Sequence, residues 1–197
     1  MYTIYYTLIG IVAFFIAALV LGAWLRSHRT KADAEKSSRV MHFLFFAGLV
    51  APPIVGIFYP GLARFDALLS LPSLPFKPFF LALGILLTIP GLYFLAITNK
   101  LLRSLGSGTN AFILTKRIVD DDIYKRTRNP MSLGFYLCSL AFASSSTFVL
   151  LAASLSLIPA HAFFLKYFEE LELELRFGES YLEYKKTTPF LIPRFSK

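Results

Sequence analysis

Charged residues and cysteine are both scarce in this 197-residue sequence. Asp, Glu, Lys and Arg together make up 16% of it, whereas a soluble domain has about 25%. The lone cysteine, Cys138, excludes an intramolecular disulfide and any zinc site built from several cysteines. With 56% apolar residues, the composition excludes a disordered chain and argues against a water-soluble fold.

The apolar residues are gathered into four uncharged runs that meet the length of about 20 residues needed to span a membrane. The runs are residues 3–25, 40–63, 78–99 and 129–165. As one helix, the fourth run would be about 55 Å long, far more than a bilayer requires. Its midpoint carries hydroxyl residues that suit a tight turn, Ser144 to Thr147. We therefore predict an all-α polytopic membrane protein of about five transmembrane helices, the last two forming a helical hairpin.

The basic residues explain the formal charge of +8 as membrane topology. Five spans with the N-terminus outside place 18 of the 20 Lys and Arg residues on the cytoplasmic side, as the positive-inside rule requires. The C-terminus is then cytoplasmic. A nucleic-acid partner is not expected, because that would need a soluble module with a basic face. Membrane lipids are the expected partners.

Two polar segments, residues 100–134 and 166–194, are long enough to build a site, and the hairpin brings their near ends together. In the first segment, Asn129-Pro130 stands where a loop meets a helix. The simple interpretation is an N-terminal helix cap. The functional interpretation is that Arg128 and the free helix N-terminus form a corner that binds a carboxylate or phosphate.

The second segment contains an alternation of Glu and Leu over residues 170–175, a period typical of a strand. Because it continues from a membrane-spanning arm, an unpaired strand would leave its backbone groups unsatisfied, so we predict a helix. Glu169, Leu173 and Phe177 then share one face, and Gly178 ends the helix. Glu169 and Glu170 face the Arg128 corner, where a carboxylate favours a cationic or hydroxyl-rich ligand.

These two motifs together resemble the isoprenylcysteine carboxyl methyltransferase family and its phospholipid-methyltransferase-like relatives. The first family motif is matched by Tyr124, Lys125, Arg128, Asn129, Pro130 and Gly134. The second is matched by Glu169, Glu170, Leu173, Phe177, Gly178, Tyr181, Tyr184, Pro189 and Pro193. The sequence departs from the family pattern at Asp122, Asn129 and Ser132.

The resemblance implies an S-adenosylmethionine-dependent methyltransferase whose product is S-adenosylhomocysteine. It divides the chain into three N-terminal transmembrane helices with a basic cytoplasmic loop (1–99) and a methyltransferase-like core (100–197) that ends in a cofactor-capping segment. Arg128 and Glu169 are the implied catalytic residues. The implied cofactor-binding residues are Tyr124, Arg128, Asn129, Pro130, Gly134, Glu169, Glu170, Phe177 and Tyr181. No metal site is expected.

The expected acceptor is a lipophilic or small molecule, and the expected location is a prokaryotic inner membrane. Two alternatives remain open from the sequence. One is a membrane-embedded NADPH-dependent reductase on a related scaffold, and the other is a non-catalytic member of the family. Two histidines have structural interpretations: His42 as an interfacial residue, and His161 as a residue hydrogen-bonded within the bundle.

Overall fold

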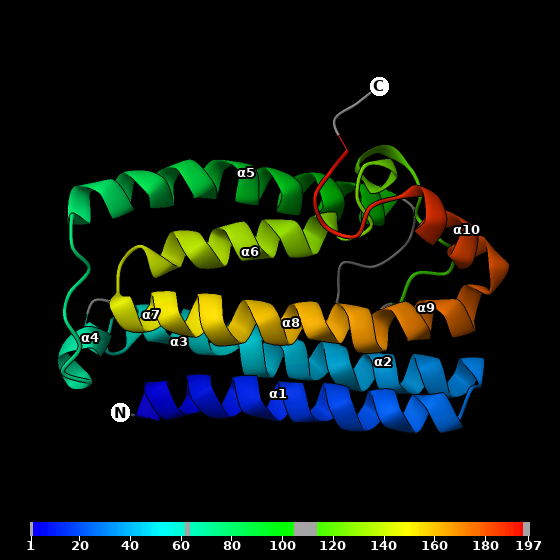
Figure 1. The fold of residues 1–197 in the computed structure, drawn as a ribbon, viewed down its shortest axis with the longest axis horizontal. Helices are drawn as coiled ribbons and strands as arrows, with labels where there is room; N and C mark the ends of the chain where they lie inside the picture. Colours follow the sequence, from blue (N-terminus) through cyan, green and yellow to red (C-terminus); the bar gives the residue numbers. More distant parts are fainter. Residues whose placement is uncertain (1, 62–63, 105–113, 195–197) are drawn as a thin grey trace.

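The computed structural model describes residues 2–61, 64–104 and 114–194 of the protein. In that part of the chain all regular secondary structure is helical, and the long helices lie side by side along one axis (Figure 1). Four helices are long and apolar enough to cross a membrane: Tyr2–Ser27, Lys31–Phe58, Lys77–Ser104 and Thr147–Phe177. The prediction of an all-α polytopic membrane protein is confirmed.

Two of the four long helices contain π-helical turns. The first long helix is α1 (Tyr2–Ser27), and the third is α5 (Lys77–Ser104). The second is divided into α2 (Lys31–Phe45), the π turn η1 (Phe46–Val50) and α3 (Ala51–Phe58). The fourth is divided into α7 (Thr147–Ala152), η3 (Ala153–Leu157), α8 (Ile158–Phe164), η4 (Leu165–Glu169) and α9 (Glu170–Phe177). The shorter elements are α4 (Arg64–Leu68), the 3-10 turn η2 (Asp122–Lys125), α6 (Pro130–Ala143) and α10 (Glu179–Thr187).

The second long helix begins earlier and ends earlier than the uncharged run 40–63. Thr30 starts it, because the Thr30 hydroxyl accepts a hydrogen bond from the Asp33 backbone N–H at 3.1 Å and so satisfies a donor of the first turn. The basic segment predicted as a loop is therefore helical from Lys31 onward. The helix ends at Phe58.

The predicted hairpin is present, with its turn at Ser144–Ser146 between α6 and α7. The first arm, α6, has 14 residues and is about 21 Å long, so it is shorter than a full membrane crossing. The buried carboxylate of Asp66 fixes the turn. It accepts hydrogen bonds from the Ser146 hydroxyl at 2.9 Å and from the backbone N–H groups of Thr147 and Phe148 at 2.9 and 2.8 Å. A negative charge at this helix N-terminus is favourable.

The π turn η1 has a cause in the sequence. Pro52 and Pro53 lack the N–H that would continue the α-helical hydrogen bonds, and the Ala51 N–H instead reaches the carbonyl of Phe46, five residues back. A second π turn, η4, brings the Glu170 N–H to the carbonyl of Leu165. Such turns change which side chains face a given direction along a helix.

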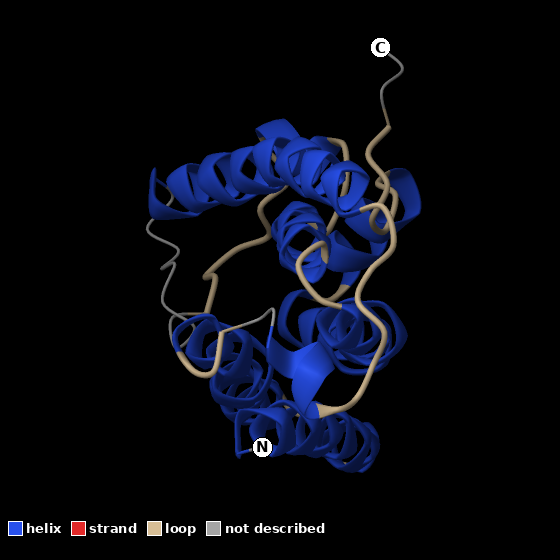
Figure 2. Ribbon diagram, turned by 90° about the vertical axis from the view of Figure 1, so that its left-hand side faces the viewer, coloured by secondary structure: helices blue, strands red, loops and turns tan. Residues whose placement is uncertain are grey.

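The helix α5 packs along α6 and forms an upper layer over the remaining helices (Figures 1 and 2). Glycines allow this contact to be close: a Cβ atom on Gly134 would lie 2.8 Å from the carbonyl oxygen of Gly91. Most of α5 otherwise faces outward; Ile89 and Leu86, for example, are 67% and 64% exposed. An apolar outer face of this kind suits contact with lipid chains.

Candidate active site

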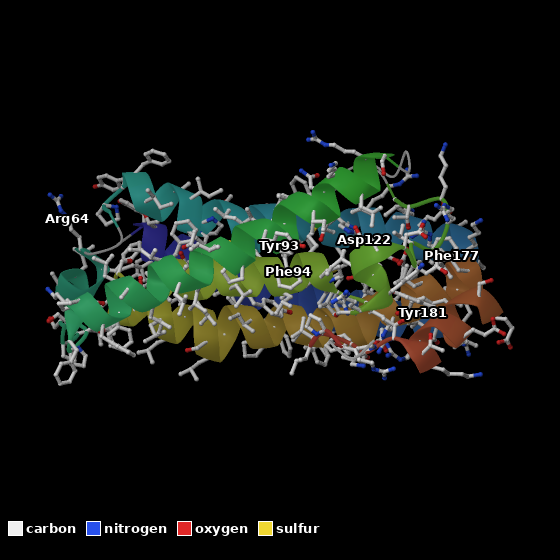
Figure 3. The ribbon with its side chains drawn as sticks, turned by 90° about the horizontal axis from the view of Figure 1, so that it is seen from above. Arg64, Tyr93, Phe94, Asp122, Phe177 and Tyr181 are labelled. Carbon is white, nitrogen blue, oxygen red and sulfur yellow. The ribbon has the colours of Figure 1, made fainter. Side chains whose placement is uncertain are left out.

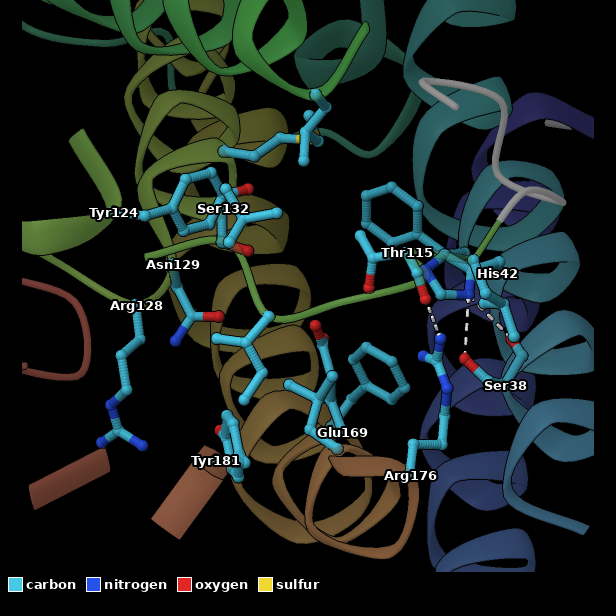
Figure 4. Close-up of a pocket in the computed structure, with 18 of the residues that line it drawn as sticks. Ser38, His42, Thr115, Tyr124, Arg128, Asn129, Ser132, Glu169, Arg176 and Tyr181 are labelled. Atoms are coloured by element: carbon cyan, nitrogen blue, oxygen red, sulfur yellow. Dashed lines mark hydrogen bonds between the residues drawn. The ribbon is translucent and has the colours of Figure 1, made fainter. Parts of the chain in front are cut away.

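A cavity of about 450 Å³ lies at the end of the bundle that carries α9 and α10. Its wall is built from α2 and η1, α5, α6, α8, η4 and α9, α10, and the segment between residues 114 and 129. Two of the lining residues, Phe177 and Tyr181, lie near one another at this end of the bundle (Figure 3), and Figure 4 shows the lining side chains in close-up. Its volume lies within the range of about 300–1,000 Å³ that is usual for small-molecule sites. Among its described lining residues, Glu169 carries the single carboxylate, and Arg117, Arg128 and Arg176 carry the guanidinium groups.

Arg128 lies at one edge of the cavity, where the loop enters α6 (Figure 4). Its side chain is 8% exposed, and its Nη1 donates to Glu170 Oε1 at 2.8 Å. Its Nε is buried and has no hydrogen-bond partner. Met131 and Ser132 of the first turn of α6 also line the cavity. A buried guanidinium donor beside a helix N-terminus is suited to hold a carboxylate or phosphate.

Glu170 does not line the cavity; it neutralises cations behind the wall. Besides Arg128, its carboxylate contacts Lys166 at 3.1 Å and Lys185 at 2.8 Å. Lys185 also contacts Glu174 at 2.7 Å. Desolvation disfavours the charge of Lys185, but the hydrogen bonds to Glu170 and Glu174 outweigh it and raise the Lys185 pKa. This network joins α9, α10 and the Arg128 loop.

Glu169 points the other way, into the cavity (Figure 4). It shares the cavity wall with Leu173 and Phe177, as the helical interpretation of this segment predicted. Its carboxylate has no ion pair or hydrogen bond among the described residues. When it is ionised, a carboxylate only accepts hydrogen bonds, and one that faces a cavity in this way favours a positive or hydrogen-bond-donating ligand.

Asn129 lines the cavity but makes no capping hydrogen bond with its side chain. Asn129 is the N-cap residue of α6, as predicted, but its Nδ2 donates to the Phe190 carbonyl at 2.8 Å instead of its side chain capping the helix. Pro130, at the first position of α6, and Gly134, in the contact with α5, are buried and do not line the cavity. These two residues shape the entry and packing of α6.

Aromatic residues cover the cavity on the α10 side. Tyr124, Phe177, Tyr181 and Tyr184 all line it, and the Tyr184 hydroxyl donates to the Tyr124 carbonyl at 2.7 Å. Desolvation, with a contribution from Glu170, raises the Tyr181 pKa, so Tyr181 stays a neutral phenol. Flat neutral rings of this kind can stack on a heterocycle.

The chain after α10 lies behind the site. The backbone N–H of Arg128 donates to the Pro189 carbonyl at 2.9 Å, and that of Arg194 to the Arg126 carbonyl at 3.0 Å. The Thr127 hydroxyl donates to the Leu191 carbonyl at 2.9 Å. Among the described residues after Tyr184, none lines the cavity. Within the expected capping segment, α10 therefore lines the cavity, and the tail contacts the Arg128 loop from outside it.

Sequence reasoning missed the wall that α2 and η1 provide. Ser38, His42, Phe45, Phe46 and Val50 all line the cavity, a place that the interpretation of His42 as an interfacial residue did not include. The one available signal was the spacing of Ser38 and His42, two polar residues one helical turn apart near an apolar run.

Arg176 and Thr115 form another part of the wall that sequence reasoning missed. Arg176 donates to Glu172 Oε1 at 2.6 Å and to the Thr115 carbonyl. It therefore joins α9 to the segment between residues 114 and 129 that lines the cavity. His161 is hydrogen-bonded to the Tyr136 hydroxyl through Nδ1 at 3.0 Å, as predicted, and it also lines the cavity.

The described part of the chain is a helical membrane bundle with a cavity at one end. A carboxylate, guanidinium groups and aromatic rings line this cavity, so the protein belongs to the class of membrane proteins with a small-molecule site. The phospholipid methyltransferase family model matches residues 79–180, more than half of the chain. The protein therefore belongs to this family of membrane methyltransferases, and the resemblance inferred from the two motifs is confirmed. No curated protein and no solved structure gives a match.

Proposed function

We propose that the protein transfers a methyl group from S-adenosylmethionine to a lipophilic or small acceptor at the cytoplasmic face of the membrane. The observation that carries this proposal is the pairing, in one cavity, of an unpartnered carboxylate at Glu169 with a buried guanidinium donor at Arg128. The basic segments near the α10 end support a cytoplasmic location for that end.

The lining residues fit the chemical groups of this cofactor. Arg128 Nε and the N-terminus of α6 would hold the carboxylate. Glu169 would face the positive groups, and Asn129 would contact the ribose or adenine. Tyr124, Phe177 and Tyr181 would pack against the adenine. When bound, the cofactor supplies a methyl group on a sulfonium for in-line displacement.

The contribution of this chain is positioning and exclusion of water. The α10 rings cover the cavity from the aqueous side, and Arg128 is held by its backbone hydrogen bond to Pro189 and its ion pair with Glu170. For an amine acceptor, Glu169 is placed to take the proton that the nitrogen loses. A carboxylate or thiolate acceptor needs no base.

The test is isothermal titration of S-adenosylhomocysteine into the detergent-purified protein. R128A and E169Q each remove one charged contact with the ligand, and such a contact contributes about 1.5–3 kcal/mol, so each should weaken binding about 10- to 100-fold. R39A and E179Q alter exposed residues away from the cavity and should bind like the wild type.

Wild-type affinity in both R128A and E169Q would remove this site from consideration. A parallel titration with NADPH separates the proposal from a reductase, which would bind NADPH in preference. Absence of binding to either cofactor would indicate a non-catalytic member of the family.

A further inference from the structure

The C-terminal tail, residues 188–194, lies where the hairpin leaves the membrane. The centroid of the Phe190 ring is 4.1 Å from Lys166 Nζ and 5.7 Å from Arg128 Cζ. Arg128 directly precedes the uncharged run 129–165, and Lys166 directly follows it. The tail, red in Figure 1, therefore passes both arms of the hairpin at the membrane boundary that the sequence predicts.

The backbone of the tail has three acceptors occupied and three donors free. The carbonyls of residues 189–191 accept hydrogen bonds of 2.8–2.9 Å from residues 127–129. The N–H groups of residues 190–192, where the chain bends, have no acceptor among the described residues. Successive N–H groups in a turn are suited to donate to anionic oxygen atoms. This stretch therefore fits a surface that is rich in such atoms.

The side chains of this region add an apolar tip and two cations. Ile192 is 77% exposed, and it is the single exposed large apolar residue of the described chain after Leu155. The backbone N–H of Arg194 donates to the Arg126 carbonyl at 3.0 Å. Both arginines are exposed, and neither has an ion pair with a described residue. No acidic residue lies in the tail. An exposed apolar residue beside unpaired cations is typical of a segment that binds an anionic membrane surface.

The tail also holds two residues of the cavity wall. The Pro189 carbonyl accepts from the Arg128 backbone N–H at 2.9 Å, and the Phe190 carbonyl accepts from Asn129 Nδ2 at 2.8 Å. Arg128 and Asn129 line the cavity, whereas the described residues of the tail do not. A partner that holds the tail therefore acts on the site through these two hydrogen bonds, without touching the ligand. Such a coupling is reciprocal, so a bound ligand also strengthens the hold on the tail.

We infer that the tail is a binding surface for anionic phospholipid head groups and that their binding there tightens the binding of the cofactor. The lipid phosphates bind Arg126 and Arg194, and Ile192 enters the membrane interface. The bound tail holds Arg128 and Asn129 in place in the cavity wall. The effect on the cofactor rests on the proposed function, whereas the contact with lipid does not depend on it. One basic residue near an anionic surface changes a binding constant about fivefold.

The contact with lipid is tested with a tryptophan at the tip of the tail. I192W is made in the W24F background, because Trp24 is the sole tryptophan of the sequence. The purified protein is placed in nanodiscs of phosphatidylcholine and phosphatidylglycerol. One lipid or the other carries brominated chains, which quench tryptophan fluorescence on contact. We expect brominated phosphatidylglycerol to quench more than brominated phosphatidylcholine at equal mole fraction. E179W in the same background replaces an exposed residue beyond the end of α9 and should be quenched by neither lipid.

The effect on the site is tested by titration of S-adenosylhomocysteine in nanodiscs with and without phosphatidylglycerol. The wild-type Kd should be about fivefold lower with phosphatidylglycerol. The double variant R126Q/R194Q should lose this difference. K36Q/R39Q removes the same charge from exposed residues of α2 and should keep it. Inorganic phosphate added to phosphatidylcholine nanodiscs at matched ionic strength should not replace the lipid, because it does not hold the tail at the membrane surface.

Four results would overturn the inference. They are equal or absent quenching of I192W by the two brominated lipids, a wild-type Kd that does not depend on phosphatidylglycerol, a dependence that persists in R126Q/R194Q, and the same effect from inorganic phosphate. Failure of the wild type to bind S-adenosylhomocysteine in either nanodisc would instead reject the proposed function. The quenching of I192W would still decide whether the tail binds anionic lipid, because that measurement needs no cofactor.

Discussion

The ion-pair network around Glu170 gives a prediction that separates support of the site from contact with the ligand. The Glu170 side chain is 9% exposed and contacts Arg128, Lys166 and Lys185. In E170Q the carboxylate becomes an amide, and the buried guanidinium of Arg128 loses its counter-charge. Removing one partner of a buried pair costs about 3–5 kcal/mol.

The lower end of that range applies here, because Lys166 and Lys185 are 50% and 32% exposed. Solvent therefore screens the attraction between these two lysines and Glu170. A loss of about 3 kcal/mol corresponds to a fall of about 6–12 °C in the unfolding midpoint for a chain of this size. The assay is thermal unfolding in detergent, with E179Q as the exposed control.

Binding of S-adenosylhomocysteine, measured below the unfolding midpoint, completes this test. Because Glu170 does not line the cavity, E170Q should keep the wild-type affinity within about threefold, whereas R128A should lose it. An unchanged midpoint would refute the energetic role of the network. A normal midpoint with lost binding would show that Glu170 contacts the ligand, as the resemblance alone implies.

Two other predictions concern the bundle away from the ligand. D66A removes the acceptor of three hydrogen bonds at the start of α7 and should lower the free energy of unfolding by about 3 kcal/mol. D66N keeps one acceptor oxygen and should lose less. Equal stability of D66A and the wild type would contradict this role of Asp66. G134A places a Cβ atom 2.8 Å from the Gly91 carbonyl oxygen. It should lower the free energy of unfolding by about 1–3 kcal/mol, because α5 and α6 must move apart, and thermal unfolding measures this change. A variant as stable as the wild type would mean that the two helices separate at no cost.

Much of the fold could be predicted because the bilayer imposes a simple rule on sequence. Uncharged runs of sufficient length marked the spans, and the hydroxyl cluster after Ala143 marked the hairpin turn. The rule failed at Lys31, where Thr30 capping extends a helix into a basic segment. The length of an uncharged run predicts which residues lie in the membrane. It does not predict how far a helix continues beyond the membrane into water.

For the candidate site, the sequence predicted which segments come together but not which side chains face the cavity. The two motifs lie at the ends of the hairpin, so chain topology alone brings Arg128 and Glu169 near one another. Within the motifs, local sequence did not distinguish a residue that faces the cavity from one that faces away. Glu169 and Glu170 are adjacent, yet one lines the cavity and the other binds three cations behind its wall.

By itself, the sequence determined that the chain crosses a membrane, that it doubles back after Arg128 and that its basic segments gather at one end, since these properties follow from local hydrophobicity and charge. Only the tertiary structure decided which side of each helix the cavity occupies. Successive helical residues point about 100° apart, and the π turn η4 shifts that direction again at Glu169. The position of His42 in the cavity wall was likewise decided by helix packing, because the local sequence of α2 does not predict which later helix this side chain will face.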